Sequence, residues 1–101
     1  MEKIELFNEK INNCRALLTP CLDASHKNDK QKGFAGMILT FLDQRTTPQL
    51  IDYFHSVRAA GVSADEYIGV LTRGFQINFE DFDPELVKKF RRYVEFFLAA
   101  S

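Results

Sequence analysis

The chain has 101 residues, of which 46% are hydrophobic and 27% charged, a composition that fits one globular domain and excludes a disordered segment. Its formal net charge is −1, from 13 basic and 14 acidic residues, so it lacks the positive charge on which general nucleic-acid binders depend. Ten Phe and no Trp predict an aromatic core, because a phenylalanine ring has no polar group to satisfy.

The first predicted helix covers residues 3–18. Its apolar residues recur at steps of three and four, which places them on one helical face: Ile4, Phe7, Ile11, Cys14 and Leu18. Thr19 ends the helix, because a residue that precedes a proline is pushed out of the helical region. The segment is too charged for a signal peptide, and no apolar run approaches the length of a membrane span, so we expect a cytoplasmic protein that does not enter membranes.

The two cysteines, Cys14 and Cys21, lie close together in the sequence. We interpret them as free, partly buried thiols. A disulfide is the alternative, although Pro20 between them interrupts any simple helical geometry. Two cysteines do not form the disulfide framework of a secreted protein.

Residues 21–32 predict a polar connector with room for a short turn or the start of a helix. The second helix then follows over residues 33–43, with a wide apolar face: Phe34, Met37, Ile38, Phe41 and Leu42. A third helix is predicted after Thr47 as the cap and Pro48 as the first helical residue, with Gly61 just past its end. Its apolar residues are Leu50, Ile51, Phe54 and Val57.

Residues 63–66, Ser-Ala-Asp-Glu, predict a capping box that opens a fourth helix ending at Gly74. The apolar residues of this helix are Tyr67, Ile68, Val70 and Leu71. Asp83, Pro84 and Glu85 predict the start of a fifth helix, whose buried side is formed by Leu86, Val87, Phe90, Val94, Phe97 and Leu98. Short connections and the lack of alternating strands predict an all-α, compact single-domain bundle of four to five helices over residues 1–101.

Residues 58–74 resemble the helix-turn-helix family of DNA-binding proteins. Gly61, Val62 and Ser63 match its turn, which needs a positive φ, a core valine and a helix cap. The start of the second helix, which would face DNA bases, instead carries Asp65 and Glu66, whose carboxylates the phosphates repel. The basic residues Lys88, Lys89, Arg91 and Arg92 lie on another helix, where they could contact only the DNA backbone. We therefore interpret the segment as an ordinary capped corner and keep DNA recognition as the alternative.

The sequence offers no recognisable catalytic or metal-binding motif. The histidines His26 and His55 and the cysteines have none of the spacings typical of metal sites, and both histidines are expected on the surface. Glycine-rich phosphate loops and nucleophile motifs are also missing from the sequence. We therefore expect a protein that is not an enzyme and has no cofactor and no metal.

The segment over residues 75–85 places phenylalanines among acids in a predicted connector, and connectors lie on the surface. One interpretation is that Phe79 and Phe82 fold back into the core, while the acids stabilise the start of the next helix. The other is an acidic and aromatic epitope for a protein partner. The candidate partner-binding residues are Asp65, Glu66, Phe79, Glu80, Asp81, Phe82 and Asp83.

These observations lead to three functional hypotheses. The first is a small binding protein that neutralises a partner with a basic surface, as a bacterial immunity protein or antitoxin neutralises a toxin, for example a nuclease. The second is a helix-turn-helix regulator. The third is a structural or adaptor domain that forms a homodimer, with Phe96 as an exposed ring near the end of the last helix.

Overall fold

The computed structural model describes residues 2–23 and 28–101, and this part of the chain folds into α-helices and 3-10 turns without any strand. The helices are α1 (Lys3–Leu18), α2 (Asp29–Asp43), α3 (Thr47–Ala59), α4 (Ala64–Gly74) and α5 (Pro84–Ala100). The 3-10 turns are η1 (Thr19–Leu22) and η2 (Phe79–Asp81). The predicted all-α, single-domain bundle is therefore confirmed.

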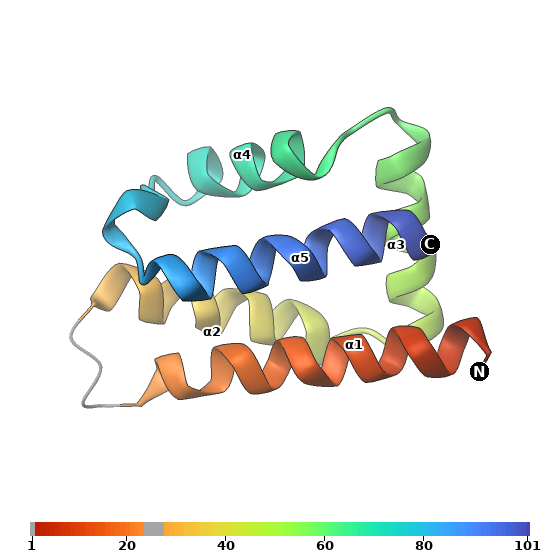
Figure 1. Ribbon diagram of the computed structural model, residues 1–101, viewed down its shortest axis with the longest axis horizontal. Helices are drawn as coiled ribbons and strands as arrows, with labels where there is room; N and C mark the ends of the chain where they lie inside the picture. Colours follow the sequence, from red (N-terminus) through yellow and green to blue (C-terminus); the bar gives the residue numbers. More distant parts are fainter. Residues whose placement is uncertain (1, 24–27) are drawn as a thin grey trace.

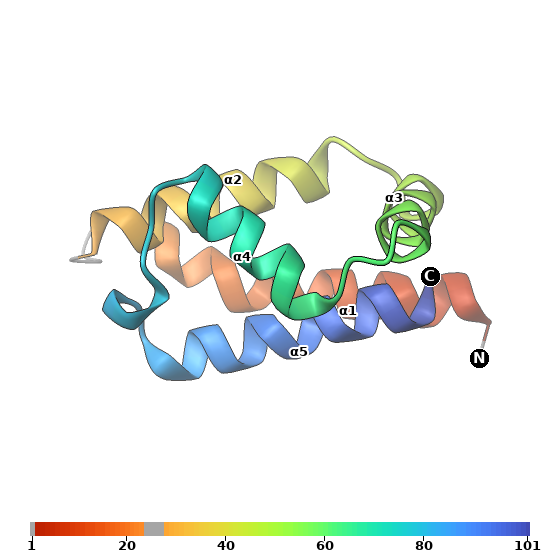
Figure 2. The ribbon, with the colours of Figure 1, turned by 90° about the horizontal axis from the view of Figure 1, so that it is seen from above.

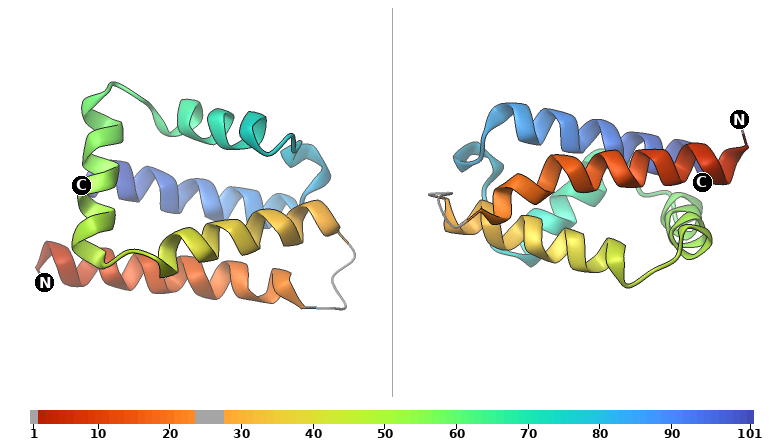
Figure 3. Two further views of the ribbon diagram at one scale, coloured as in Figure 1. Left: turned by 180° about the vertical axis from the view of Figure 1, so that it is seen from behind. Right: turned by 90° about the horizontal axis from the view of Figure 1, so that it is seen from below.

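The two longest helices, α1 and α5, lie side by side and run antiparallel, and α3 crosses one end of the bundle (Figure 1). Helix α2 packs along α1, and α4 packs along α5 (Figure 2). Helices α1 and α5 form one layer of the bundle, and α2 and α4 lie in a second layer behind them (Figure 3). The bundle measures 38 × 25 × 22 Å.

The core is rich in phenylalanine, as the composition predicts. The rings of Phe54 and Phe97 stack at 5.1 Å, and Phe7 lies 5.2 Å from Phe97, so α1, α3 and α5 meet around these rings. The buried phenylalanines are Phe7, Phe34, Phe54, Phe82, Phe90 and Phe97. The remaining four, Phe41, Phe75, Phe79 and Phe96, are half-buried and pack against this core.

Three residues predicted on buried faces are exposed: Ile4, Met37 and Val70 are 49%, 44% and 55% accessible. Ile4 lies in the first turn of α1, which extends past α3 at the end of the bundle (Figure 1). Met37 and Val70 belong to α2 and α4, which do not pack closely on one another. The buried faces of α1 and α2 are therefore narrower than the apolar pattern predicted, and α4 has no buried residue at all.

Helix starts show two further differences from the sequence prediction. Helix α2 begins at Asp29, inside the predicted connector, and Asn28 caps it by accepting a hydrogen bond from the Gln31 amide at 3.0 Å. The first turn of this helix is polar, so apolar periodicity does not reveal it. Helix α3 is capped by Thr46 and not by Thr47, because Thr46 and Gln49 form a reciprocal capping box.

The corner between α3 and α4 has the predicted turn at Gly61 and the predicted cap at Ser63, whereas Val62 is only half-buried. Gly61 has a φ of 81°, a conformation that favours glycine, and Ser63 caps α4 by accepting a hydrogen bond from the Glu66 amide at 3.2 Å. The Glu66 carboxylate accepts a hydrogen bond from the Ser63 hydroxyl at 3.3 Å, so it does not return to the Ser63 backbone amide as a full capping box requires. Asp83 caps α5 through the Glu85 amide at 3.0 Å.

Candidate functional site

The acidic segment connects α4 to α5 at one end of the bundle (Figure 1). Gln76, with a φ of 53°, reverses the chain after α4, and Asn78 then starts η2 by accepting a hydrogen bond from the Glu80 amide at 3.0 Å. The side chains of Glu80, Asp81, Asp83 and Glu85 are all exposed. We refer to these four residues as the acidic turn.

The phenylalanines of this segment pack inward. Phe82 is 4% exposed, and its ring lies 5.8 Å from that of Phe34 on α2. Phe79 is half-buried and meets the Phe34 ring edge-on at 5.4 Å. The ring of Phe90 on α5 lies 5.3 Å from the same Phe34 ring. Phe34 therefore holds residues 79–82 against α2 and α5. A partner that docks on this structure can therefore reach Phe79, whereas Phe82 would act by fixing the turn.

Hydrogen bonds from the first turn of α2 hold the backbone of the acidic turn. The Asn28 side chain donates to the Asp81 carbonyl at 2.7 Å, and the Gln31 side-chain oxygen accepts from the Asp83 amide at 2.9 Å. Gln31 is itself 4% exposed, and its amide nitrogen lies 3.6 Å from the Cys21 sulfur. The turn is therefore a fixed part of the bundle, although it carries exposed charges.

The carboxylates of the acidic turn form no ion pair within the described ranges 2–23 and 28–101. Asp83 uses its carboxylate as a helix cap, and the carboxylates of Glu80, Asp81 and Glu85 are left to solvent. Their negative charge is thus available to a partner.

Asp65 and Glu66 do not join this turn. They lie in the first turn of α4, eight or nine residues before its end at Gly74, so about 12–14 Å of helix separates them from the segment that follows (Figure 1). The Asp65 carboxylate forms an ion pair with Arg91 of α5, and Glu66 bonds to Ser63. The predicted partner-binding residues therefore fall into two separate groups.

The surface resembling a helix-turn-helix also differs from a DNA-reading one in its charges. The start of α4 presents the exposed carboxylate of Glu66 and the Asp65–Arg91 ion pair. Helix α4 packs mainly on α5, and Tyr67 joins it to α3 through a 3.0 Å hydrogen bond to the Tyr53 hydroxyl. The arrangement favours a structural corner.

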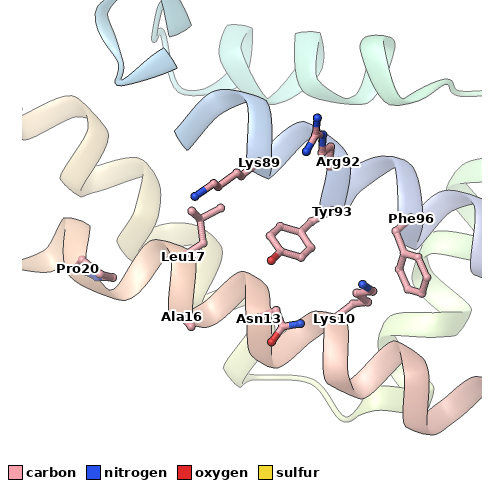
Figure 4. Close-up of a pocket in the computed structure, with 9 residues that line it drawn as sticks. All are labelled: Lys10, Asn13, Ala16, Leu17, Pro20, Lys89, Arg92, Tyr93 and Phe96. Carbon is pink, nitrogen blue, oxygen red and sulfur yellow. The ribbon is translucent and has the colours of Figure 1, made fainter. Parts of the chain in front are cut away.

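A groove of about 670 Å³ lies between the outer faces of α1 and α5 and is open to solvent (Figure 4). Lys10 from α1 and Lys89 and Arg92 from α5 line it, together with the rings of Tyr93 and Phe96. Sequence reasoning noticed the basic residues of the last helix but missed the groove. Its two walls come from opposite ends of the chain, so no local pattern could have brought them together.

The described residues contain no group of three or more His, Cys, Asp or Glu side chains able to hold a metal ion, and His26 lies outside them. His55 is exposed, and its Nδ1 lies 3.3 Å from the Ser101 carbonyl oxygen and 3.3 Å from Arg58. Arg58 donates to the same carbonyl at 2.7 Å. Cys14 and Cys21 are buried free thiols. Burial raises the pKa of the Cys14 thiol to about 12, which keeps it protonated and unreactive at neutral pH.

No helix in the described part of the chain combines the length and the hydropathy that crossing a bilayer requires. No protein-family model matches the chain, and no match was found among curated proteins or among solved structures.

Proposed function

We propose that this chain is a small non-enzymatic binding protein that neutralises a protein partner by docking its acidic turn on a basic surface of that partner. A bacterial immunity protein or antitoxin that acts in the cytoplasm is the type we favour. A nuclease toxin is a suitable partner, because the cleft in which a nuclease holds nucleic acid is basic.

The observation that carries this proposal is a fixed turn whose carboxylates form no ion pair in the part of the chain that the structure describes. Asn28 and Gln31 hold the backbone of the turn, and Phe82 anchors it in the core, so little conformational entropy is lost on binding. The exposed carboxylates of Glu80, Asp81 and Glu85 supply the negative potential that steers a basic partner into place. Phe79, at the edge of the turn, adds apolar contact area.

The test is capture of partners from a lysate of the source organism with the tagged protein at moderate salt. The wild-type chain is compared with Glu80→Gln/Asp81→Asn, which removes two charges from the turn and leaves the Asp83 cap and the core rings in place. Glu9→Gln/Asp52→Asn is the matched control, because it removes two exposed carboxylates from α1 and α3. Mass spectrometry identifies the captured proteins.

We expect the wild type and the control to capture one stoichiometric protein that the turn variant fails to retain. The turn variant should bind this protein about tenfold more weakly, which corresponds to about 1.4 kcal/mol of binding free energy. Equal retention by the turn variant would reject the acidic turn as the binding surface. Captured nucleic acid without a protein would favour the helix-turn-helix alternative, and self-association alone would favour the adaptor.

A further inference from the structure

The groove between α1 and α5 has the chemistry of a second binding surface, separate from the acidic turn. Its cations, Lys10, Lys89 and Arg92, form no ion pair within the described residues, and no acidic residue lines it. This concentration of positive charge is unexpected in a chain whose net charge is −1. An anionic occupant could form ion pairs with these cations and so offset their charge.

The floor of the groove is aromatic. Tyr93 is half-buried, its ring stacks on Phe97 at 6.4 Å, and in Figure 4 the ring reaches from α5 toward α1. Its hydroxyl has no hydrogen-bond partner among the residues that the structure describes. Phe96 lies beside it, with the Lys10 ammonium 5.6 Å from the centre of its ring. The groove therefore offers apolar contact in its floor and positive charge along its rims.

We infer that this groove binds an amphipathic helix of a protein partner, with apolar side chains on the floor and acidic side chains toward Lys10, Lys89 and Arg92. A third helix can pack in the groove between two antiparallel helices, and binding of an amphipathic helix in such a groove is a common mode of peptide recognition. From Lys10 to Pro20 the wall formed by α1 and η1 is about 15 Å long, enough for about three turns of a docked helix.

Other occupants fit the groove less well. A second copy docked through the same groove in a two-fold dimer would bring together two surfaces that carry the same cations and, among the described lining residues, no acid to pair with them. An extended nucleic-acid strand would run past Lys89 into the adjoining hollow, where Asp83 and Glu85 would repel its phosphates. A small molecule would be poorly enclosed, because the groove is open, whereas ligand pockets bury most of the ligand surface.

The probe for this inference is a terminally blocked peptide of 15 residues, with Leu and one Trp on one helical face and Glu on the other. The chain contains no Trp, so Trp emission reports on the peptide alone. The variant Lys89→Glu/Arg92→Glu reverses the charge of the groove. The control, Lys88→Glu/Lys30→Glu, makes the same change in net charge at exposed residues that do not line the groove.

We expect the wild type to bind the peptide with a blue shift of its Trp emission. The groove variant should weaken binding about tenfold more than the control, while circular dichroism shows that both are folded. The following results would overturn the inference: equal weakening by the two variants, no binding at about 1 mM peptide, displacement of the peptide by single-stranded DNA at lower concentration, or a concentration-dependent mass that the groove variant abolishes.

This test is independent of the proposed function. The acidic turn repels an acidic peptide, so Glu80→Gln/Asp81→Asn should leave peptide binding unchanged or strengthen it. A groove that fails to bind the peptide would leave the acidic turn and its basic partner unaffected.

Discussion

Cys14 shows how burial of a single group ties stability to pH. Its side chain is 1% exposed, and desolvation raises its thiol pKa from an ordinary 9.0 to about 12, against a smaller opposing effect of Arg15. Above pH 9 the unfolded chain releases this proton while the folded chain keeps it. The contribution of the neutral Cys14 thiol to the free energy of unfolding is therefore complete below pH 9. It is lost as the pH rises toward 12, by at most about 1.4 kcal/mol per pH unit.

We expect Cys14→Ala to unfold more readily than the wild type at pH 7 but to lose less stability between pH 9 and pH 10. Denaturant titrations at these pH values measure how the unfolding free energy of each protein changes with pH. Burial also raises the pKa of Tyr67, so part of the alkaline loss remains in the variant. Identical slopes in the two proteins would show that Cys14 does not carry this effect.

The hydroxyl groups of Tyr53 and Tyr67 form a 3.0 Å hydrogen bond that joins α3 to α4 in a partly buried position. We expect Tyr67→Phe and Tyr53→Phe each to cost about 1 kcal/mol of unfolding free energy, because each leaves the other hydroxyl without this partner. The double variant should cost less than the sum of the two. A double-mutant cycle in urea measures this coupling, and strict additivity would contradict it.

At the residue scale, the sequence predicted chemistry better than it predicted contacts. The acidic character of the turn can be read directly, but whether Phe79 and Phe82 point inward depends on Phe34, which lies far away in the chain. The pairing of Asp65 with Arg91 is equally remote. Such contacts depend on how helices are placed relative to one another, which local patterns do not contain.

Among the elements, the start of α3 gives a direct comparison between two adjacent threonines. The Thr46 side chain caps the helix by accepting from the Gln49 amide, whereas the Thr47 hydroxyl donates to the Asn8 side chain at 2.9 Å on the surface. We expect Thr46→Ala to cost about 1 kcal/mol and Thr47→Ala clearly less. Thermal or urea unfolding of the two variants measures the difference, and the reverse order would show that Thr47 is the cap in solution.

Helix α4 differs from the other helices in having no buried residue. Its apolar side chains, such as Tyr67 and Leu71, only half-enter the core, and Val70 is open to solvent. We expect its amides to exchange with solvent through a local opening of lower free energy than those of α1 and α5. Native-state hydrogen exchange over a denaturant series measures this. A single opening free energy shared by all three helices would contradict it.

Helix starts and ends were predictable wherever the capping residue stands next to an apolar repeat. Ser63 and Asp83 cap where they were expected to, and α1 ends before Pro20 as expected. The predicted reason was wrong, because Thr19 keeps helical angles (φ −56°, ψ −43°) and leads directly into η1. The start of α2 was left open between a turn and a helix start, because Asp29 to Lys32 add a polar turn ahead of Phe34 that apolar periodicity does not detect. Adjacent threonines were confused because both Thr46 and Thr47 satisfy the rule for a cap, and only the position of Gln49 distinguishes them.

For the whole molecule, the net charge of −1 sums over an acidic surface and a basic surface that are separate from each other. The acidic turn carries Glu80, Asp81, Asp83 and Glu85, while the neighbouring groove carries Lys10, Lys89 and Arg92. Overall composition therefore predicted one globular domain with an aromatic core but gave no sign of the two charged surfaces. They exist because the bundle sets α1 against α5 and ties the turn to α2.

The most direct test of the proposed function is hydrogen exchange of the protein with and without the partner captured from lysate. We predict that new protection falls on the amides of residues 76–85, with smaller changes over α2 and α4. Protection centred on α3 and the start of α4, with residues 76–85 unchanged, would contradict it and show that the partner docks elsewhere on the bundle.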